Sequence, residues 1–374
     1  MSSTSQATLT NEQPLPRPRW ILHIQAQFWR MLMGIGMLMH RLAPPRPPKP
    51  NFVRKIPTTI AARQGHILLH FYTPKDYGVG RQLNGHRYPV VVNFHGGGFT
   101  LGKATDDARW CKTVVDEVNA VVVSVDYRLA PEHPFPTAVE DGADAILYLA
   151  EHARELNLDL DKIAVSGFSS GANMCFTVPL RLQEELFNEI SDEEARRLSV
   201  IQMRRPPLQK AFSNGRLLVR VQREISIKAI VSWYPPTDYT HTREQRRATC
   251  TRLDQQLPAI FTNLFDESYL QPPTLDMANP YLSPGVAPDY MLAGLPQEII
   301  IIACEWDMLV AEAERFSQRL QQDLGKSVRF RVVPGVPHGW DKAPNPLRVT
   351  PGVQTHYLEA CRELKRCLNG SSDA

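Results

Sequence analysis

The sequence carries little net charge and lacks any sustained block of like-charged residues. Its 374 residues include 42 Lys and Arg against 39 Asp and Glu, which leaves a formal net charge of +3. Proteins that bind nucleic acid concentrate positive charge on one face or in one segment, because most of their contacts go to phosphates. The balance of charge therefore argues against nucleic acid as a partner.

The cysteine patterns of metal sites and of disulfide-stabilised domains are also missing. None of the six cysteines belongs to a CxxC pair or to a Cys/His cluster; they are Cys111, Cys175, Cys250, Cys304, Cys361 and Cys367. We therefore predict no metal site. Scattered, reduced thiols are typical of intracellular proteins. A cleaved signal peptide is not indicated, because few positive charges precede the first apolar run and no small-x-small site follows it. A cytoplasmic location is the resulting expectation.

The first 50 residues differ in composition from the rest of the chain. Residues 1–19 are rich in Ser, Thr, Gln and Pro and show no apolar period, which predicts a disordered start. Residues 20–42 are strongly apolar and end ahead of Pro44 and Pro45, and proline is poorly tolerated inside a helix. We expect residues 20–50 to form an apolar helix and a proline-rich linker.

The role of residues 20–42 is open among three alternatives. About 20 apolar residues are enough to span a bilayer, but polar side chains interrupt this run. On a helical wheel the interruptions fall on one narrow stripe, which consists of His23, Gln27, Arg30, Gly34 and Arg41. A stripe favours a helix that lies on a surface, either as a cap over an apolar pocket or in a membrane interface as a peripheral contact.

Residues 51–370 show short β-branched runs that alternate with helical patterns, which predicts one α/β domain with a mostly parallel sheet flanked by helices. Runs that are apolar throughout indicate strands buried on both faces. The predicted strands are Tyr88–Phe94, Ala120–Val125, Lys162–Ser166, Ala229–Trp233, Glu298–Ala303 and Val328–Val333, with an antiparallel edge pair at Val53–Thr58 and Ile67–Tyr72. The predicted helices are Thr105–Glu117, Thr137–Glu155, Gly171–Leu186, Val310–Asp323 and Gly352–Leu368.

Two stretches interrupt this alternation. Residues 188–224 are strongly charged, which predicts a solvated insertion. Residues 236–296 are rich in loops, Pro and Tyr and follow the end of a predicted strand. Enzymes of the α/β class place substrate-facing elements at that position, so we expect cap or substrate loops there.

The serine of a short glycine-flanked motif is the candidate nucleophile. The motif Gly167-Phe168-Ser169-Ser170-Gly171 follows a predicted strand and precedes a predicted helix. A Gly-x-Ser-x-Gly sequence in this context is typical of a nucleophile elbow, a tight turn whose small residues let the serine hydroxyl stand clear of the backbone. We predict that Ser169, between Gly167 and Gly171, is a catalytic nucleophile and that the chain breaks acyl bonds.

The sequence also supplies a base and an acid for this serine. A serine hydroxyl attacks at neutral pH only with a base within hydrogen-bond distance and a carboxylate that orients the base. Asp307 and His338 each follow a late strand, in the order Ser, Asp, His that this sheet topology requires. Four alternatives stay open: Asp307 caps a helix that begins at Met308, Glu305 is the acid, His338 is a surface turn residue, or Ser169 belongs to a purely structural elbow.

A second glycine cluster, His95-Gly96-Gly97-Gly98, follows the strand Tyr88–Phe94. Without Cβ atoms, its backbone N–H groups can turn inward and stabilise the oxyanion of a tetrahedral intermediate. We predict that the amides of Gly97, Gly98 and Ser170 form this oxyanion hole. A phosphate-binding loop is the alternative, but neither GxxxxGK[ST] nor GxGxxG occurs in the sequence.

Taken together, these motifs resemble the hormone-sensitive-lipase family of α/β hydrolases. The matching segments are HGGGF at 95–99, DYRLAPEHPFPTAVED at 126–141, the elbow at 167–171, YPPTD at 234–238, DML at 307–309 and PHG at 337–339. The resemblance covers residues 60–368 and implies an eight-stranded α/β-hydrolase sheet, a serine esterase activity, no cofactor and an N-terminal cap helix over an acyl pocket. The family elbow is usually Gly-Asp-Ser-Ala-Gly, so Phe168 and Ser170 are departures.

The residues and the resemblance lead to one preferred function and two alternatives. We expect a serine carboxylester hydrolase that takes small to medium hydrophobic esters as its small-molecule partner and passes through an acyl-enzyme. The first alternative is an acyltransferase or deacylase of a metabolite in a biosynthetic pathway. The second is a non-catalytic ligand receptor on the same fold, as in gibberellin receptors, which resemble the family but lack the catalytic histidine. The sequence makes no prediction of the oligomeric state.

Overall fold

A computed structural model describes residues 17–78, 87–202 and 225–369 of the chain, with only the backbone course of residues 188–202. Residues 1–16 of the expected disordered start and residues 203–224 of the expected insertion lie outside this description. Structure begins ahead of the boundary expected at residue 20. Arg17 donates to Glu267 at 2.7 Å (Nε to Oε2), and Arg19 is the first residue of a helix.

One sheet of eight strands forms the centre of the fold, in the order β1-β2-β4-β3-β5-β6-β7-β8. The strands are β1 (Phe52–Pro57), β2 (His66–Tyr72), β3 (Tyr88–Phe94), β4 (Val121–Asp126), β5 (Leu158–Phe168), β6 (Ile227–Trp233), β7 (Glu298–Cys304) and β8 (Ser327–Val333). β1 pairs antiparallel with β2, and β2 pairs antiparallel with β4. The remaining neighbours pair in parallel. The predicted α/β fold and its antiparallel edge pair are confirmed.

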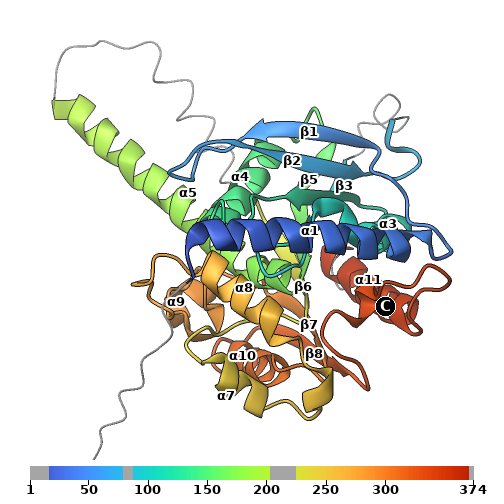
Figure 1. The fold of residues 1–374 in the computed structure, drawn as a ribbon. Helices are drawn as coiled ribbons and strands as arrows, with labels where there is room; N and C mark the ends of the chain where they lie inside the picture. The colour runs from blue at the N-terminus through green and yellow to red at the C-terminus, as the bar shows by residue number, and fades with distance from the viewer. Residues whose placement is uncertain (1–16, 79–86, 203–224, 370–374) are drawn as a thin grey trace, which may run out of the picture.

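Alternate side chains of the central strands pack into two separate cores, one on each face of the sheet. On β3, Val90 and Val92 belong to one core and Val91 to the other, as the two-residue period of a strand requires. The first core is covered by α4 (Thr137–Glu151), α5 (Ser170–Gln202) and α10 (Val310–Gln322), and the second by α3 (Ala108–Val118) and α11 (Val353–Asn369) (Figure 1). Burial of β-branched residues on both faces explains why these strands read as continuous apolar runs.

One helix extends beyond its predicted end. We expected a helix over Gly171–Leu186, and α5 continues to Gln202, so the charged stretch that starts at residue 188 begins as helix. Figure 1 shows this part of α5 projecting away from the sheet and its covering helices. The stretch that we predicted to be a solvated insertion is thus helical as far as Gln202.

A second layer of helices lies over one end of the sheet. It consists of α1 (Arg19–Leu42) and of the segment after β6, with α7 (Arg243–Ala248), α8 (Ala259–Tyr269) and α9 (Asp289–Leu292). Figure 1 shows α1 and α8 side by side, and the rings of Trp29 and Phe261 join them with centroids 4.6 Å apart. The predicted helix at 20–42 and the predicted loop-rich segment at 236–296 therefore meet in space.

The orientation of α1 is the main surprise of the fold. Arginines of its polar stripe bind the protein: Arg30 binds Glu132, and Arg41 binds Thr105 and Asp106. The side of the helix opposite its buried residues is apolar and exposed to solvent. No helix in the described parts of the chain has the length and apolarity that crossing a bilayer requires.

Candidate active site

The turn between β5 and α5 holds Ser169 in a strained conformation. Its φ of 52° lies in the left-handed region, which non-glycine residues rarely adopt outside functional turns. The flanking glycines are required by close packing. A Cβ on Gly167 would lie 2.3 Å from the carbonyl oxygen of Gly171, and a Cβ on Gly171 would lie 2.0 Å from that of Phe94. The turn therefore sits directly against the end of β3.

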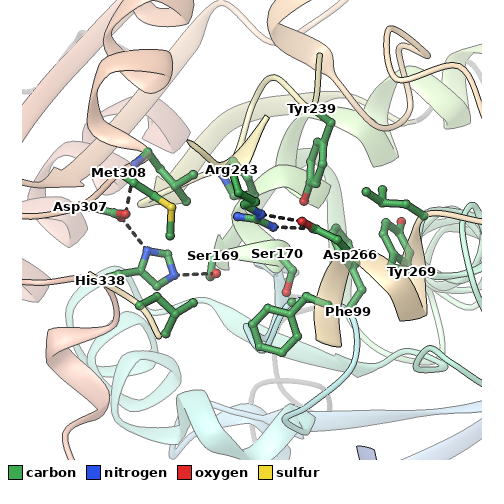
Figure 2. A pocket seen from close by; sticks show the side chains of 16 residues that line it. Phe99, Ser169, Ser170, Tyr239, Arg243, Asp266, Tyr269, Asp307, Met308 and His338 are labelled. Carbon is green, nitrogen blue, oxygen red and sulfur yellow. Dashed lines mark hydrogen bonds and ion pairs between the residues drawn. The ribbon is translucent and has the colours of Figure 1, made fainter. Parts of the chain in front are cut away.

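The three residues predicted as a triad lie in one hydrogen-bonded row (Figure 2). Ser169 Oγ is 2.8 Å from His338 Nε2, and His338 Nδ1 is 2.6 Å from Asp307 Oδ2. Asp307 follows β7 and His338 follows β8, so neighbouring strands bring the acid and the base together. With Nδ1–H donating to the carboxylate, Nε2 is the nitrogen that faces the serine hydroxyl.

The alternatives for these residues do not fit the local geometry. α10 begins at Val310 with Leu309 as its N-cap, so Asp307 is not the cap; its Oδ1 accepts the N–H of Leu309 at 3.1 Å while Oδ2 faces His338. Glu305 accepts the N–H of Gly335 at 2.6 Å and so points elsewhere. The side chain of His338 is only 12% exposed, unlike a surface turn residue.

The loop that contains His95-Gly96-Gly97-Gly98 presents unused backbone donors to the elbow. Gly97 and Gly98 have φ values of 120° and 61°, which suit glycine because other residues would be strained there. In the described part of the chain, the N–H groups of Gly97, Gly98 and Ser170 donate to no acceptor. Backbone N–H groups without a partner are what an oxyanion hole requires.

Tyr127, in the DYRLAPE motif, holds this glycine loop in place. Its hydroxyl donates to the carbonyl of His95 at 2.7 Å, and its ring stacks on the His95 ring with centroids 4.2 Å apart. Next to it, Arg128 and Asp141 form a buried ion pair with an Nη2 to Oδ1 distance of 2.6 Å. Sequence reasoning used this motif only as a mark of resemblance and missed these roles.

Glu132, from the same motif, ties α1 to the site. It accepts from Gln27 at 3.0 Å and from Arg30 at 2.8 Å, and Arg30 also donates to the carbonyl of Thr100 at 2.9 Å. Burial alone would raise the pKa of Glu132, but the hydrogen bonds from Arg30 hold it below its usual value. The polar stripe seen on the helical wheel was therefore a signal for this contact, although its partner was not identified.

A buried group of charges lies behind the elbow, where Phe168 replaces the family's usual aspartate. Lys342 Nζ is 3.0 Å from Asp107, 2.8 Å from Asp341 and 3.6 Å from the centre of the Phe168 ring. Burial would lower the pKa of Lys342, but the two carboxylates hold it well above its usual range. Asp341 also accepts the hydroxyl of Tyr234 at 2.6 Å, and the Tyr234 ring packs edge-on against His338.

Two cavities of different size and polarity meet at Ser169 and His338. The inner cavity has a volume of about 40 Å³, and its lining includes the ion pair of Arg243 and Asp266, whose Nε and Oδ2 atoms are 2.7 Å apart (Figure 2). The outer cavity has a volume of about 400 Å³ and an apolar wall that includes Trp29, Leu32, Met33, Met37, Phe261 and Phe265. The site therefore offers unequal room on the two sides of the serine.

Comparisons with known proteins show which family the fold belongs to. A family model described as alpha/beta hydrolase fold matches residues 91–342. The esterase LipI of Mycobacterium tuberculosis is 34% identical over 177 residues, which cover 46% of this chain and 54% of that protein. The hormone-sensitive lipase of Ictidomys tridecemlineatus is 40% identical over 92 residues, or 25% of this chain and 12% of that lipase.

Solved structures extend the likeness over nearly the whole chain. An esterase of Pyrobaculum calidifontis is similar at a TM-score of 0.67 and 26% identity, with 93% of this chain and 96% of that chain covered. The match to the mycobacterial esterase is shorter, since it spans only about half, 54%, of that protein's length.

Proposed function

The chain belongs to the hormone-sensitive-lipase family of α/β hydrolases, and from this membership and the site geometry we propose that it is a serine carboxylester hydrolase. The observation that carries the proposal is the row of hydrogen bonds from Ser169 through His338 to Asp307, at 2.8 and 2.6 Å. These distances allow a proton to pass between the serine and the histidine.

The proposed reaction follows from the positions of these groups. The Oγ of Ser169 attacks the ester carbonyl, while His338 Nε2 takes the serine proton and Asp307 stabilises the imidazolium that forms. The N–H groups of Gly97, Gly98 and Ser170 hold the oxyanion. His338 then returns the proton to the departing alcohol, and a water molecule, activated by the same histidine, hydrolyses the acyl-enzyme.

The two cavities support a substrate with a short acyl group and a bulky apolar alcohol. A single water needs roughly 10–15 Å³ of such space, so the inner cavity of about 40 Å³ has room for only a few heavy atoms. The outer cavity of about 400 Å³ has the size and the apolar lining typical of small-molecule sites. We assign the acyl group to the inner cavity and the alcohol to the outer one, with α1 as the cap over the alcohol.

Hydrolysis of p-nitrophenyl acetate, butyrate and octanoate by the purified protein tests this proposal. We expect kcat/KM to fall from acetate to octanoate, and Ser169→Ala to lose at least ~10³-fold of the activity on acetate. A fluorophosphonate probe should label the wild-type protein and not Ser169→Ala. Unchanged hydrolysis by Ser169→Ala would refute the assignment of the nucleophile, and product esters formed with added alcohols would identify an acyltransferase instead.

A further inference from the structure

The outward side of α1 is an apolar stripe that no other element within residues 17–78, 87–202 and 225–369 covers. It consists of nine residues that are between 37% and 65% exposed: Trp20, Ile24, Phe28, Met31, Leu32, Ile35, Leu38, Met39 and Leu42. They recur every three or four residues along the 24-residue helix, so they share one face. We refer to these nine residues as the outer face of α1. Soluble monomers rarely expose a continuous apolar surface of this kind.

The contacts of the inner side fix this orientation. Arg30 is bound to Glu132 near the middle of the helix, and Arg41 is bound to Asp106 near its end. His40 directly precedes Arg41 and is buried against the carbonyl of Ala343 and the guanidinium of Arg109. Turning the outer face inward would break these ion pairs and bury apolar groups against charged ones, which is unfavourable. The outer face is therefore a stable feature of the fold.

The charges around α1 select the kind of surface that the outer face can meet. The sequence has no Asp or Glu between Glu12 and Asp76. Three exposed cations flank the helix, Arg19 at its start and Arg46 and Lys49 in the linker, and none of them pairs with a carboxylate within the described ranges. Each cation near an anionic lipid surface contributes about 1 kcal/mol of attraction.

The same charges disfavour a second copy of the chain as the occupant. Two α1 helices packed face to face would carry only cations along their common edge, with no carboxylate on either helix to pair with them. Coiled coils instead rely on opposite charges beside the apolar seam. An anionic bilayer supplies both the apolar interior and the negative charge that this helix lacks.

The outer face is continuous with the outer cavity. Leu32 belongs to both, and Trp29, Met33 and Met37 on the same helix line the cavity beside it. Ile260, on the neighbouring helix α8, is 54% exposed and adds to the apolar surface. An apolar molecule dissolved in a membrane would thus meet apolar side chains from the helix surface into the cavity.

From these observations we propose that α1 lies in the interface of an anionic lipid membrane, with its outer face in the boundary between headgroups and acyl chains. The helix axis then runs parallel to the membrane plane, because the inner side remains attached to the protein along its length. This binding does not depend on the proposed ester hydrolysis. Only the further step, entry of the apolar substrate from the lipid into the outer cavity, rests on that function.

Vesicle flotation of the full chain tests the proposal. Ser169→Ala is used as the background, so that vesicle binding is measured without ester hydrolysis. We expect binding to vesicles of phosphatidylcholine with phosphatidylserine, weakening at high salt, and little binding to phosphatidylcholine alone. The double substitution Ile24→Glu with Leu38→Glu should reduce binding at least about tenfold, since two carboxylates would enter the apolar boundary.

The control is Tyr290→Glu on α9, which changes a residue that is 80% exposed but lies outside α1. It should bind vesicles as the parent does. The same substitutions in the active chain should leave hydrolysis of a water-soluble acetate ester unchanged, which shows that the variants fold. Equal vesicle binding by the α1 variant and the control would overturn the proposal. So would sedimentation that shows the parent chain as a dimer and the α1 variant as a monomer, if the parent also fails to bind vesicles.

Discussion

At the scale of single residues, two carboxylates two positions apart, Glu305 and Asp307, have separate tasks. Asp307 accepts from His338, while Glu305 accepts a backbone N–H from Gly335. We predict that Asp307→Asn lowers kcat by about 10⁴-fold, because the amide favours the wrong tautomer of the histidine. Glu305→Gln, the matched control, should stay within about tenfold of the wild-type kcat on p-nitrophenyl acetate. Equal losses in the two variants would show that Asp307 has no special role.

Removal of Lys342 should cost substantial stability. Asp107 and Asp341 are both buried and face its ammonium at 3.0 and 2.8 Å. Lys342→Met keeps the aliphatic stem but leaves two carboxylates without their cation, and breaking a buried ion pair typically costs about 3–5 kcal/mol. Urea unfolding should show that loss. Lys112→Met, which removes an exposed pair with Asp116, should cost no more than about 0.5 kcal/mol.

The residues found from the sequence and those missed differ in one respect. Ser169, Gly97 and Gly98 lie in short motifs whose local geometry already implies a task, and Asp307 and His338 follow strands that the pattern identified. Tyr127, Glu132 and Lys342 act by holding other groups in place. Tyr127 lies 32 residues along the chain from His95, whose carbonyl it binds, and Glu132 lies 102 residues from Arg30. Such contacts exist only after the sheet has formed, so no local pattern reports them.

At the scale of elements, helical periodicity gives the members of a face but not the direction in which that face points. The wheel grouped His23, Gln27 and Arg30 correctly on one side of α1. Whether a polar stripe turns toward water or toward the protein depends on its partner, and Glu132 is supplied by a different loop. The strands were easier, because burial on both faces makes their direction irrelevant. The end of α5 was missed because the sequence from residue 188 onward was interpreted, from its many charges, as a solvated insertion.

The attachment of α1 should depend on pH through His40. Burial, with smaller effects of Lys342 and Arg109, lowers the pKa of His40 from 6.5 to about 4. The folded protein therefore keeps His40 neutral, with Nε2 accepting from Arg109 at 3.3 Å. At a pH between these two values, His40 carries a proton in the unfolded chain but not in the folded protein. The contribution of His40 to the free energy of unfolding is therefore fully present above pH 6.5 and is lost as the pH drops toward 4. Within this range the free energy of unfolding falls by about 1.4 kcal/mol for each pH unit.

A non-titrating residue at this position tests the assignment. His40→Gln retains a donor and an acceptor but cannot take up the proton. We expect the plot of Tm against pH to be flatter for this variant than for the wild type between about pH 6.5 and 4. Parallel curves across that window would mean that another group causes the acid loss of stability.

At the scale of the whole molecule, segments that lie far apart in the described chain converge on one serine. The inner cavity is walled by loops after β6 and β7 together with α8, whereas the outer cavity is walled by α1 and α8. The sequence predicted substrate loops in 236–296 and offered a cap as one alternative for 20–42, but it did not predict that these segments divide the site into a small and a large compartment. That division depends on side-chain volumes in the assembled layer, which no single segment determines.

The division itself leads to a final prediction. Leu270 lines only the inner cavity and Leu32 only the outer one. Leu270→Ala should enlarge the acyl compartment and raise the ratio of kcat/KM for octanoate to that for acetate by about 10-fold or more, since each added methylene in an apolar pocket is worth about 1–3 kcal/mol. Leu32→Ala removes the same number of atoms but should leave that ratio unchanged and alter the preference among acetate esters of different alcohols. If Leu32→Ala changes the acyl preference and Leu270→Ala does not, the acyl group occupies the outer cavity and the assignment of the two compartments is reversed.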